Sequence, residues 1–195
     1  MPKFKDSMIT GTPSPAWFAL YTRHQHEKAV ASSLQSKGVE VFLPLYNSAH
    51  RWKDRVKQLS LPLFPNYVFV FVDLESRFAI FASPGIYDFV RAAGRPAAIP
   101  VEEIEGVRRV IEKGLSAEPH PFLKSGDRVR LKNGPLDGIE GILVRKKSFY
   151  RLVLSVELLA RSISVEVDVA DVERMDDRSA GRASYATSVA VQGGY

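Results

Sequence analysis

The sequence predicts an α+β fold in two domains, a mixed sandwich of helices and strands followed by a small all-β domain. In the first part of the chain, short strand-like runs alternate with segments of helical period but form no long β-α-β series, which favours an α+β sandwich with an antiparallel sheet. Beyond residue 123 the helical period disappears, and glycines recur at 126, 134, 138 and 141. Many short strands separated by such turns are best accommodated by a small closed β-barrel.

The first strands and the first helix follow from local patterns. Trp17–Thr22 is typical of a strand, and a helix over His26–Lys37 ends at Gly38, a residue suited to the position after a helix. A second strand is expected at Val41–Leu45. The alternating polar run Lys53–Leu61 indicates one arm of a hairpin.

The rest of the first domain is built around a fully apolar strand. Tyr67–Val72 does not alternate, which indicates a strand buried on both faces. A helix over Glu75–Ser83 and a strand over Tyr87–Arg91 are expected next. Proline and two carboxylates after residue 99 favour a further helix. Its apolar stripe is expected to comprise Ile104, Val107 and Ile111.

Composition changes divide the chain into five segments. A polar leader is expected at 1–15, the first domain at 16–114, a linker with two prolines at 115–123, the β-barrel at 124–176 and a disordered tail at 177–195. Within the barrel, Tyr150–Val156 and Ile163–Val167 are rich in β-branched residues, which favours strands over helices.

The composition excludes several classes of protein. There is no cysteine, so disulfides and thiolate metal sites are excluded. The N-terminal residues carry no apolar stretch of signal-peptide length, and the longest apolar run is too short to span a bilayer. A cytoplasmic protein with no membrane partner is therefore expected. The net charge of +5 is mild, so any contact with nucleic acid should be a local patch.

No catalytic or cofactor motif is apparent. His24, His26 and Glu27 do not have the spacing that places two histidines on one helical face, so a metal site is not expected. The chain has neither a phosphate-binding loop nor a glycine-rich dinucleotide turn. We therefore expect no enzymatic activity, no cofactor and no metal.

The segment Leu61-Pro-Leu-Phe-Pro-Asn-Tyr-Val-Phe-Val70 is the most informative part of the chain. Pro62 and Pro65 lack a backbone donor and fix φ, so they predict a stiff turn that leads into the buried strand. Phe64, between them, is expected at the edge of the core. A rigidly held aromatic in such a place suits a hydrophobic docking surface.

Three motifs in order resemble the NusG family of transcription elongation factors. They are the strand Trp17–Thr22, the proline segment Leu61–Val70 and the glycine-rich segment Gly126–Gly141. The resemblance extends from about Trp17 to Arg174. It implies an NGN domain over 16–114 and an SH3-like KOW barrel over 124–176.

The resemblance implies that the first domain binds RNA polymerase. In the family this surface receives the clamp helices of the β′ subunit. The matching residues here are Tyr21, Phe64, Pro65, Tyr67 and Phe69. Ordinary core packing is the alternative, and it is favoured for Phe69, whereas docking is favoured for Phe64 and Tyr67.

The resemblance also implies proximity to the non-template DNA strand. The matching cationic residues are Arg23, His24 and Lys28. A second basic cluster, from Arg51 to Lys57, lies on the predicted hairpin arm. A solvated charged face is the alternative explanation for both clusters.

In the KOW domain the resemblance implies a second protein partner, either the ribosomal protein NusE or the termination factor Rho. The matching residues are Leu136, Ile139, Leu158, Leu159 and Arg161, and the loop at Leu158 is expected to expose apolar side chains. The glycines around it are explained equally well as hairpin turns. The general family factor has an aromatic residue and a glycine where this chain has Leu159 and Ala160.

The segments Gly85–Val90 and Arg151–Val156 are more similar to specialised RfaH-like or UpxY-like paralogues. We therefore expect a monomeric processive antiterminator that modulates pausing and termination. Its second domain is expected to be a β-barrel rather than a helical hairpin over Val153–Val167, and it is not expected to mask the docking face. A ribosome-associated KOW protein that binds RNA is the alternative.

Overall fold

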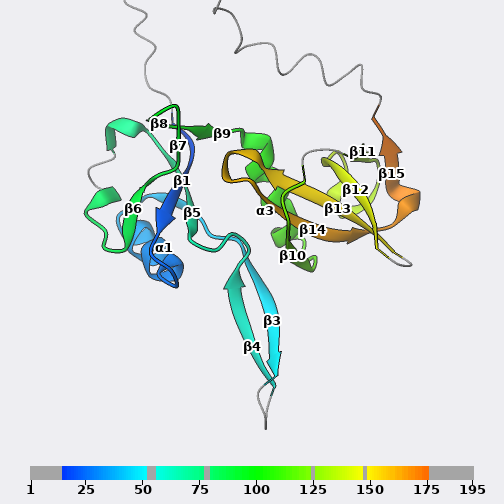
Figure 1. Cartoon of the computed structure of the whole chain (residues 1–195), viewed down its shortest axis with the longest axis horizontal. Coiled ribbons are helices and arrows are strands. Elements are labelled where there is room, and N and C mark those ends of the chain that lie inside the picture. Colours follow the sequence, from blue (N-terminus) through cyan, green and yellow to red (C-terminus); the bar gives the residue numbers. More distant parts are fainter. Residues whose placement is uncertain (1–14, 52–55, 77–79, 124–125, 147–148, 176–195) are drawn as a thin grey trace, which may run out of the picture. The chain divides into compact units, whose positions relative to one another are not determined.

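The computed structural model describes residues 15–51, 56–76, 80–123, 126–146 and 149–175 (Figure 1). The chain divides between Ile104 and Glu105 into two compact units. Residues 1–14 of the predicted leader, the predicted tail, and Lys53, Arg55 and Phe78 lie outside the described residues.

The first unit is built on an antiparallel sheet of order β2-β5-β1-β6. Its strands are β1 (Ala16–Thr22), β2 (Glu40–Phe42), β5 (Tyr67–Val72) and β6 (Ile86–Phe89), and β9 (Ala98–Ile99) also pairs with β1. The apolar strand β5 has a neighbour along each edge, and it is mostly buried on both faces, although Phe71 is 36% exposed. The α+β class with an antiparallel sheet is confirmed.

Helix α1 (Glu27–Ser36) packs on one face of this sheet. Val30 and Leu34 of the helix join Leu20, Val68 and Val70 of the strands in a fully buried core. The predicted helix over His26–Lys37 is therefore confirmed to within one residue at each end.

The opposite face of the sheet is aromatic. Trp17 contacts Phe71 with ring centroids 5.4 Å apart, and Phe69 contacts Phe42 at 6.1 Å. Both faces are apolar because alternate side chains of β1 and β5 point to opposite sides, and neither set is polar.

Strands β3 (Leu45–Arg51) and β4 (Val56–Pro62) form a hairpin that projects from the first unit's sheet as a two-stranded arm (Figure 1). The predicted strand Val41–Leu45 is instead divided between β2 and β3. The division falls at Pro44, which has no backbone donor and whose carbonyl accepts a hydrogen bond from Leu63 N at 2.9 Å.

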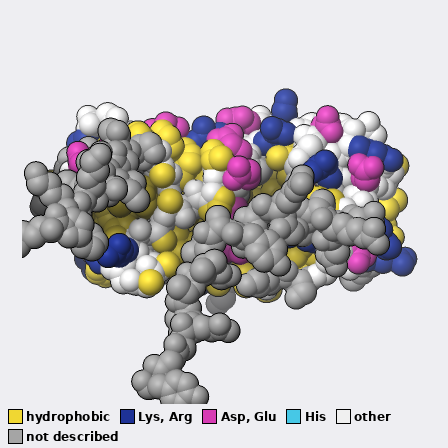
Figure 2. All heavy atoms as spheres, turned by 90° about the horizontal axis from the view of Figure 1, so that it is seen from above, with side chains coloured by type: hydrophobic (Ala, Val, Ile, Leu, Met, Phe, Trp, Pro, Cys, Tyr) yellow, Lys and Arg dark blue, Asp and Glu magenta, His cyan; other side chains and the backbone are white. Residues whose placement is uncertain are grey.

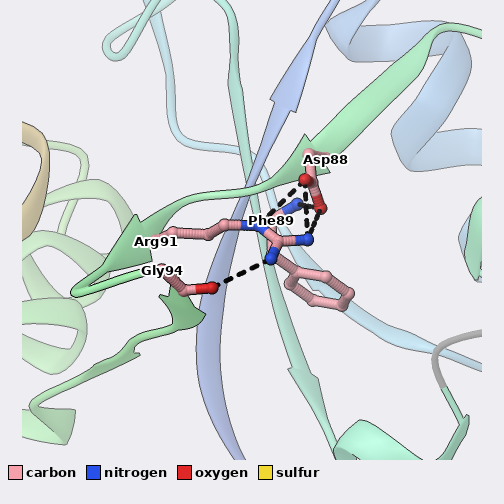
Figure 3. Close-up of polar contacts among 4 residues, drawn as sticks. All are labelled: Asp88, Phe89, Arg91 and Gly94. Carbon is pink, nitrogen blue, oxygen red and sulfur yellow. Dashed lines mark hydrogen bonds and ion pairs between the residues drawn. The ribbon is translucent and has the colours of Figure 1, made fainter.

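A second, very short hairpin follows β6. Strands β7 (Arg91–Ala92) and β8 (Arg95–Pro96) pair, and Arg91 closes the turn (Figure 3). Its Nε donates to Asp88 Oδ2 at 2.9 Å, and its Nη1 donates to the carbonyl of Gly94 at 3.0 Å. The side-chain hydrogen bond from Arg91 lowers the pKa of Asp88 below its ordinary value of 3.8. The predicted strand Tyr87–Arg91 is thus broken at Val90.

A 3-10 turn, η1 (Leu74–Ser76), starts the segment that was expected to form a helix over Glu75–Ser83, and the middle of that segment lies outside the described residues. Helix α3 (Val101–Glu112) buries Ile104, Val107 and Val110. Val110 therefore takes the place that the sequence analysis gave to Ile111.

The division after Ile104 contradicts the predicted domain boundary at residue 114. Most of α3 belongs with the second unit, where a Cβ placed on Gly106 would lie 3.8 Å from Leu154 Cδ1. Arg109 Nη1 also donates to the carbonyl of Asp137 at 2.8 Å. Sequence periodicity identified the helix but not the unit against which it packs.

The second unit is one antiparallel sheet of order β10-β14-β13-β12-β11-β15. Its strands are β10 (Ala117–His120), β11 (Asp127–Leu131), β12 (Glu140–Lys146), β13 (Phe149–Val156), β14 (Arg161–Val167) and β15 (Val172–Arg174), with 3-10 turns η2 (Gly134–Leu136), η3 (Glu157–Leu159) and η4 (Val169–Asp171) between them. The predicted strands Tyr150–Val156 and Ile163–Val167 are confirmed as β13 and β14. In the described residues β10 and β15 are the sheet's two edges, so strand pairing does not close the predicted barrel.

The predicted linker, 115–123, is partly a strand. Ala117–His120 form β10 and pair with Ser162–Val165 of β14. The two prolines that suggested a linker are compatible with this arrangement because an edge strand tolerates residues without a donor.

Within the described residues, the longest helix, α3, has only 12 residues, and no helix is long and apolar enough to cross a membrane.

Candidate docking site

The proline turn between β4 and β5 places its central aromatic inside the first unit. Phe64 is only 1% exposed, and its ring packs edge-on against that of Phe69 at 5.3 Å. The expectation that Phe64 is presented at the edge of the core is therefore wrong. The turn instead folds Phe64 against Phe69 of β5, a contact that the sequence alone did not reveal. Pro65, next in the chain, is exposed.

Asn66 anchors the turn to its neighbours. It has a left-handed backbone, with φ of 72°, and its carbonyl accepts a hydrogen bond from Thr22 N at 2.8 Å. Its own N–H donates to Glu27 Oε1 at 2.8 Å, and its Oδ1 lies 3.1 Å from His24 Nδ1. Glu27 belongs to the first turn of α1 and is only 4% exposed, so its buried carboxylate anchors the proline turn to this helix. The position of the following Tyr67 is fixed as a result.

Three tyrosines lie together at the end of the sheet where this turn enters it. Tyr21 stands opposite Tyr67 in the strand register, with ring centroids 5.7 Å apart. The ring of Tyr87 lies 5.5 Å from that of Tyr21 on its other side. Tyr21 is 42% exposed and Tyr87 is 62% exposed. We refer to Tyr21, Tyr67 and Tyr87 as the tyrosine cluster.

Tyr87 was missed by the sequence analysis. Regular alternation from the buried Phe89 would turn Tyr87 into the core. The pairing of β1 with β6 shifts register between Tyr21 and Thr22, where Asp88 and Ile86 are the successive partners. Tyr87 is the extra residue of this bulge, and a bulge re-aims the side chain it carries. No sequence signal marks the bulge.

The tyrosine cluster contains two of the five predicted polymerase-binding residues. Tyr21 and Tyr67 contribute rings to it, whereas Phe64 and Phe69 are buried beneath the sheet face. Phe69 therefore follows the core-packing alternative. Exposed aromatic rings held by a rigid scaffold are the kind of surface at which binding energy concentrates in protein interfaces.

The predicted DNA-proximal cations lie on the segment after β1 and on α1. Arg23, His24 and Lys28 are all exposed. The Lys28 ammonium donates to the carbonyl of Ser60 on β4 at 2.6 Å, so it fixes the base of the hairpin arm. On the face seen in Figure 2, cationic and anionic side chains are intermixed.

In the second unit, the predicted partner residues are mostly buried. Leu136, Ile139 and Leu159 point inward, so the expectation that the loop at Leu158 exposes apolar side chains is wrong for Leu159. The chain folds Ile139 inward because Leu131 N donates to its carbonyl at 3.0 Å, closing the glycine turn over the sheet. Leu158 is half-buried and Arg161 is exposed. Ala160 between them has a left-handed backbone, with φ of 48°.

In the parts of the chain that the structure describes, no three His, Cys, Asp or Glu side chains gather as a metal would require. His24 and His26 are instead joined through a hydrogen bond between His26 Nδ1 and the carbonyl of His24 at 3.1 Å. Their arrangement belongs to the turn before α1.

Together, the chain comprises an α+β unit with exposed rings at one end of its sheet and a second, antiparallel β unit. Comparison with known proteins relates part of the chain to one family. Residues 15–108 match the family model described as transcription termination factor NusG. The chain therefore carries a NusG family domain, and the resemblance drawn from its motifs is confirmed.

Similar proteins extend the match beyond that domain. The chain is 26% identical over 190 residues to the transcription termination/antitermination protein NusG of Borreliella burgdorferi, across 83% of this chain and 100% of that protein. It is 29% identical over 188 residues to the protein of the same name from Deinococcus radiodurans, across 81% and 98%. The solved structure of Thermotoga maritima NusG covers 84% of this chain and 98% of its own, with a TM-score of 0.51 and 20% identity, and shows the same fold.

Proposed function

We propose that this protein is a bacterial transcription elongation factor that binds RNA polymerase through its tyrosine cluster. The observation that carries the proposal is the grouping of three rings, two of them substantially exposed, at the end of a rigid sheet. The similar proteins named transcription termination/antitermination protein NusG support the assignment to transcription.

The polymerase partner that suits this surface is the pair of β′ clamp helices. An amphipathic helix presents an apolar stripe with polar flanks, and tyrosine rings offer both an apolar face and a hydroxyl. Phe64 and Phe69 support the rings from below without touching the partner. A factor bound there would oppose the clamp opening that accompanies pausing and termination.

Arg23 and His24 lie on the segment that directly follows Tyr21, so a factor seated on the clamp would present them beside the DNA in the transcription bubble. We assign them to the non-template strand. Contacts of this kind to the sugar-phosphate backbone position a protein without reading the base sequence.

The second domain would bind a second protein at the high local concentration that covalent linkage provides. Leu158 and Arg161 are the predicted residues that remain accessible for this role, with NusE or Rho as the partner. We further assign the chain to the specialised RfaH-like or UpxY-like antiterminators, which act processively on particular long operons.

Single-round transcription with purified bacterial core polymerase tests the proposal. Tyr87→Ala and Tyr67→Ala should each weaken binding to polymerase and remove the effect of the protein at a pause and at a Rho-dependent terminator. A hot-spot ring commonly contributes about 2 kcal/mol, which corresponds to roughly 30-fold in affinity.

Phe81→Ala is the matched control. Phe81 is as exposed as Tyr21, at 42%, but it packs on Phe89, whose side chain belongs to the core under α1 on the other face of the sheet. Its removal should leave polymerase binding unchanged. Equal loss in all three variants, or tight binding to ribosomal RNA with none to polymerase, would reject the proposal and favour the ribosome-associated alternative.

A further inference from the structure

Strand β10 occupies the outer edge of the second unit's sheet. Its residues pair antiparallel with β14, from Ala117 opposite Val165 to His120 opposite Ser162 (Figure 1). Without β10, the amide and carbonyl groups of β14 that face outward would be unpaired. A free edge of this kind is a template for the addition of another extended strand.

The chain beyond β10 continues across the face of the sheet beside this edge. Ser155 Oγ donates to the carbonyl of Leu123 at 3.1 Å and lies 2.8 Å from Ser162 Oγ. Leu123 N in turn donates to Ser162 Oγ at 3.4 Å. Ser162 and Ser164 are buried. We call residues 117–123 the strap, since they cover both the edge of β14 and this row of hydroxyl groups.

Arg151 on β13 is the charged group at the centre of the covered surface. Its side chain is only 13% exposed, and its Nη1 donates to Glu118 Oε2 of the strap at 2.6 Å and to Ser164 Oγ at 2.9 Å. Its Nε is buried without a hydrogen-bond partner among the described residues. An arginine fork can bind a carboxylate through two parallel hydrogen bonds. Glu118 accepts from Nη1, which is one nitrogen of that fork.

Two features of the strap weaken its hold on the edge of β14. It contributes a four-residue edge strand containing Pro119, which cannot donate to β14, and its Glu118 side chain is half exposed. A buried donor without a partner is unfavourable, so a ligand that engages both Nε and an Nη atom would gain a hydrogen bond that the strap does not supply.

From these observations we propose that the edge of β14, with Arg151 beside it, is a docking site for an extended acidic segment of a partner protein, and that the strap is its displaceable occupant. The partner segment would add as an antiparallel strand and place a carboxylate on the Arg151 fork. The occupant is acidic because the buried group that it must satisfy is a guanidinium, and it is extended because the site is a strand edge.

Two variants of the full-length chain test whether loss of the charge on the strap loosens the strap alone or the whole domain. Glu118→Gln removes the charge that pairs with Arg151. Glu140→Gln is the matched control, since Glu140 pairs with Arg130 on the same sheet away from the strap. Hydrogen–deuterium exchange should increase roughly tenfold over residues 117–120 and 162–165 in Glu118→Gln only, while β11 and β12 keep their protection.

The probe for the docking site is a fluorescein-labelled peptide with the sequence of residues 116–123, followed by fluorescence anisotropy. It should bind the Glu118→Gln chain about tenfold more tightly than the wild-type chain, because the resident strap competes less well. The same peptide with glutamine in place of its glutamate should lose about tenfold on that variant. Ser155→Ala loosens the strap without changing any charge, and it should raise peptide binding as well.

Each opposite result overturns the proposal. Equal exchange in Glu118→Gln and Glu140→Gln would show that the strap is a fixed strand. An opened strap with no peptide binding, or equal binding of the two peptides, would exclude an acidic docking site. A doubled mass by light scattering in the Glu118→Gln chain would assign the edge to the strap of a second copy. None of these measurements uses polymerase, so they leave the proposed function untouched.

Discussion

Asn66 carries the most constrained backbone of the docking site. Its left-handed φ of 72° allows its N–H to reach Glu27 and its carbonyl to reach Thr22 N, so one residue joins the proline turn to α1 and β1. Asparagine is among the few side chains that adopt this conformation readily, whereas β-branched residues avoid it.

This constraint predicts opposite tolerance for two substitutions at the same position. Asn66→Val should lower the free energy of unfolding by about 1–2 kcal/mol, because valine is strained in the left-handed region. Asn66→Gly loses the same side-chain contact with His24 but adopts this φ without strain, so it should remain near the wild-type value. Urea denaturation monitored by circular dichroism measures both, and equal losses would mean that the side-chain contact, not the backbone, fixes the turn.

The Asp88–Arg91 pair gives a pH dependence with a definite sign. Arg91 lowers the pKa of Asp88 in the folded state, so the contribution of the pair is complete above the ordinary value of 3.8 and is lost as the pH falls through the lowered pKa. Asp88→Asn should therefore be slightly less stable than wild type at pH 7, and this difference should vanish below the lowered pKa.

The effect must be small because both side chains of the pair are more than 40% exposed, and water and salt screen exposed pairs. Thermal unfolding of the two proteins at pH 7 and near pH 2, each at low and high salt, measures it. A difference that grows on acidification would contradict the assigned role of Arg91.

At the scale of elements, periodicity predicted strands and helices well, but not their partners. The apolar run Tyr67–Val72 and the helix α1 are where the sequence placed them, because burial on one or two faces leaves a direct pattern of residue types. Strand β10 was expected to be linker because its prolines are read as breakers unless the edge position is known. Pairing across 40 or more residues has no local signature.

Like the elements, the candidate site was predicted only in part from the sequence. Tyr21 and Tyr67 could be found because one lies at the end of its strand and the other at the start of the next, which places both rings at one end of the sheet. Tyr87 could not, since it depends on a bulge, and Phe64 was misplaced because its burial depends on the ring of Phe69 in another element. Leu159 was misplaced for the same reason, since a loop residue that turns inward resembles an exposed one in sequence.

Two glycines of the second unit should respond in opposite directions to alanine. A Cβ on Gly141 of β12 would lie 2.7 Å from the carbonyl oxygen of Val153 and 2.9 Å from Leu152 Cδ1, so Gly141→Ala should destabilise by about 1–3 kcal/mol. On Gly106 of α3 the nearest atom, Leu154 Cδ1, is at an ordinary contact distance of 3.8 Å.

Gly106→Ala should accordingly stabilise the protein by up to about 1 kcal/mol, since alanine is the better helix former. Urea denaturation of both variants measures the two shifts. A destabilised Gly106→Ala would indicate that α3 packs more closely on the second unit than this contact suggests, and a neutral Gly141→Ala would refute the tight approach of β12 and β13.

At the scale of the whole molecule, charge sets how strongly the protein can hold nucleic acid by itself. The net charge of +5 is spread over a surface on which both signs are mixed, at least on the face seen in Figure 2. Under the proposed function, affinity for polymerase would therefore come mainly from protein docking, with nucleic acid as a weak second contact.

This argument predicts a shallow salt dependence for binding to single-stranded DNA. Arg23 and Lys28 are the two permanent charges of the predicted contact, and each phosphate neutralised on a single strand contributes about −0.7 to the slope of log K against log salt concentration. A slope near −1.4 is expected, so affinity should fall roughly sevenfold between about 50 and 200 mM salt. Anisotropy of a labelled 20-nucleotide strand measures it.

Arg23→Ala should reduce that slope by about 0.7, whereas Arg95→Ala, which removes an exposed arginine of the β7–β8 hairpin, should leave it unchanged. A slope near −5 would require an extended cationic surface that the described residues do not present, and equal effects of the two arginines would mean that binding is not localised beside the tyrosine cluster. In either case DNA would hold the factor in place independently of polymerase, and the docking rings would no longer determine where it acts.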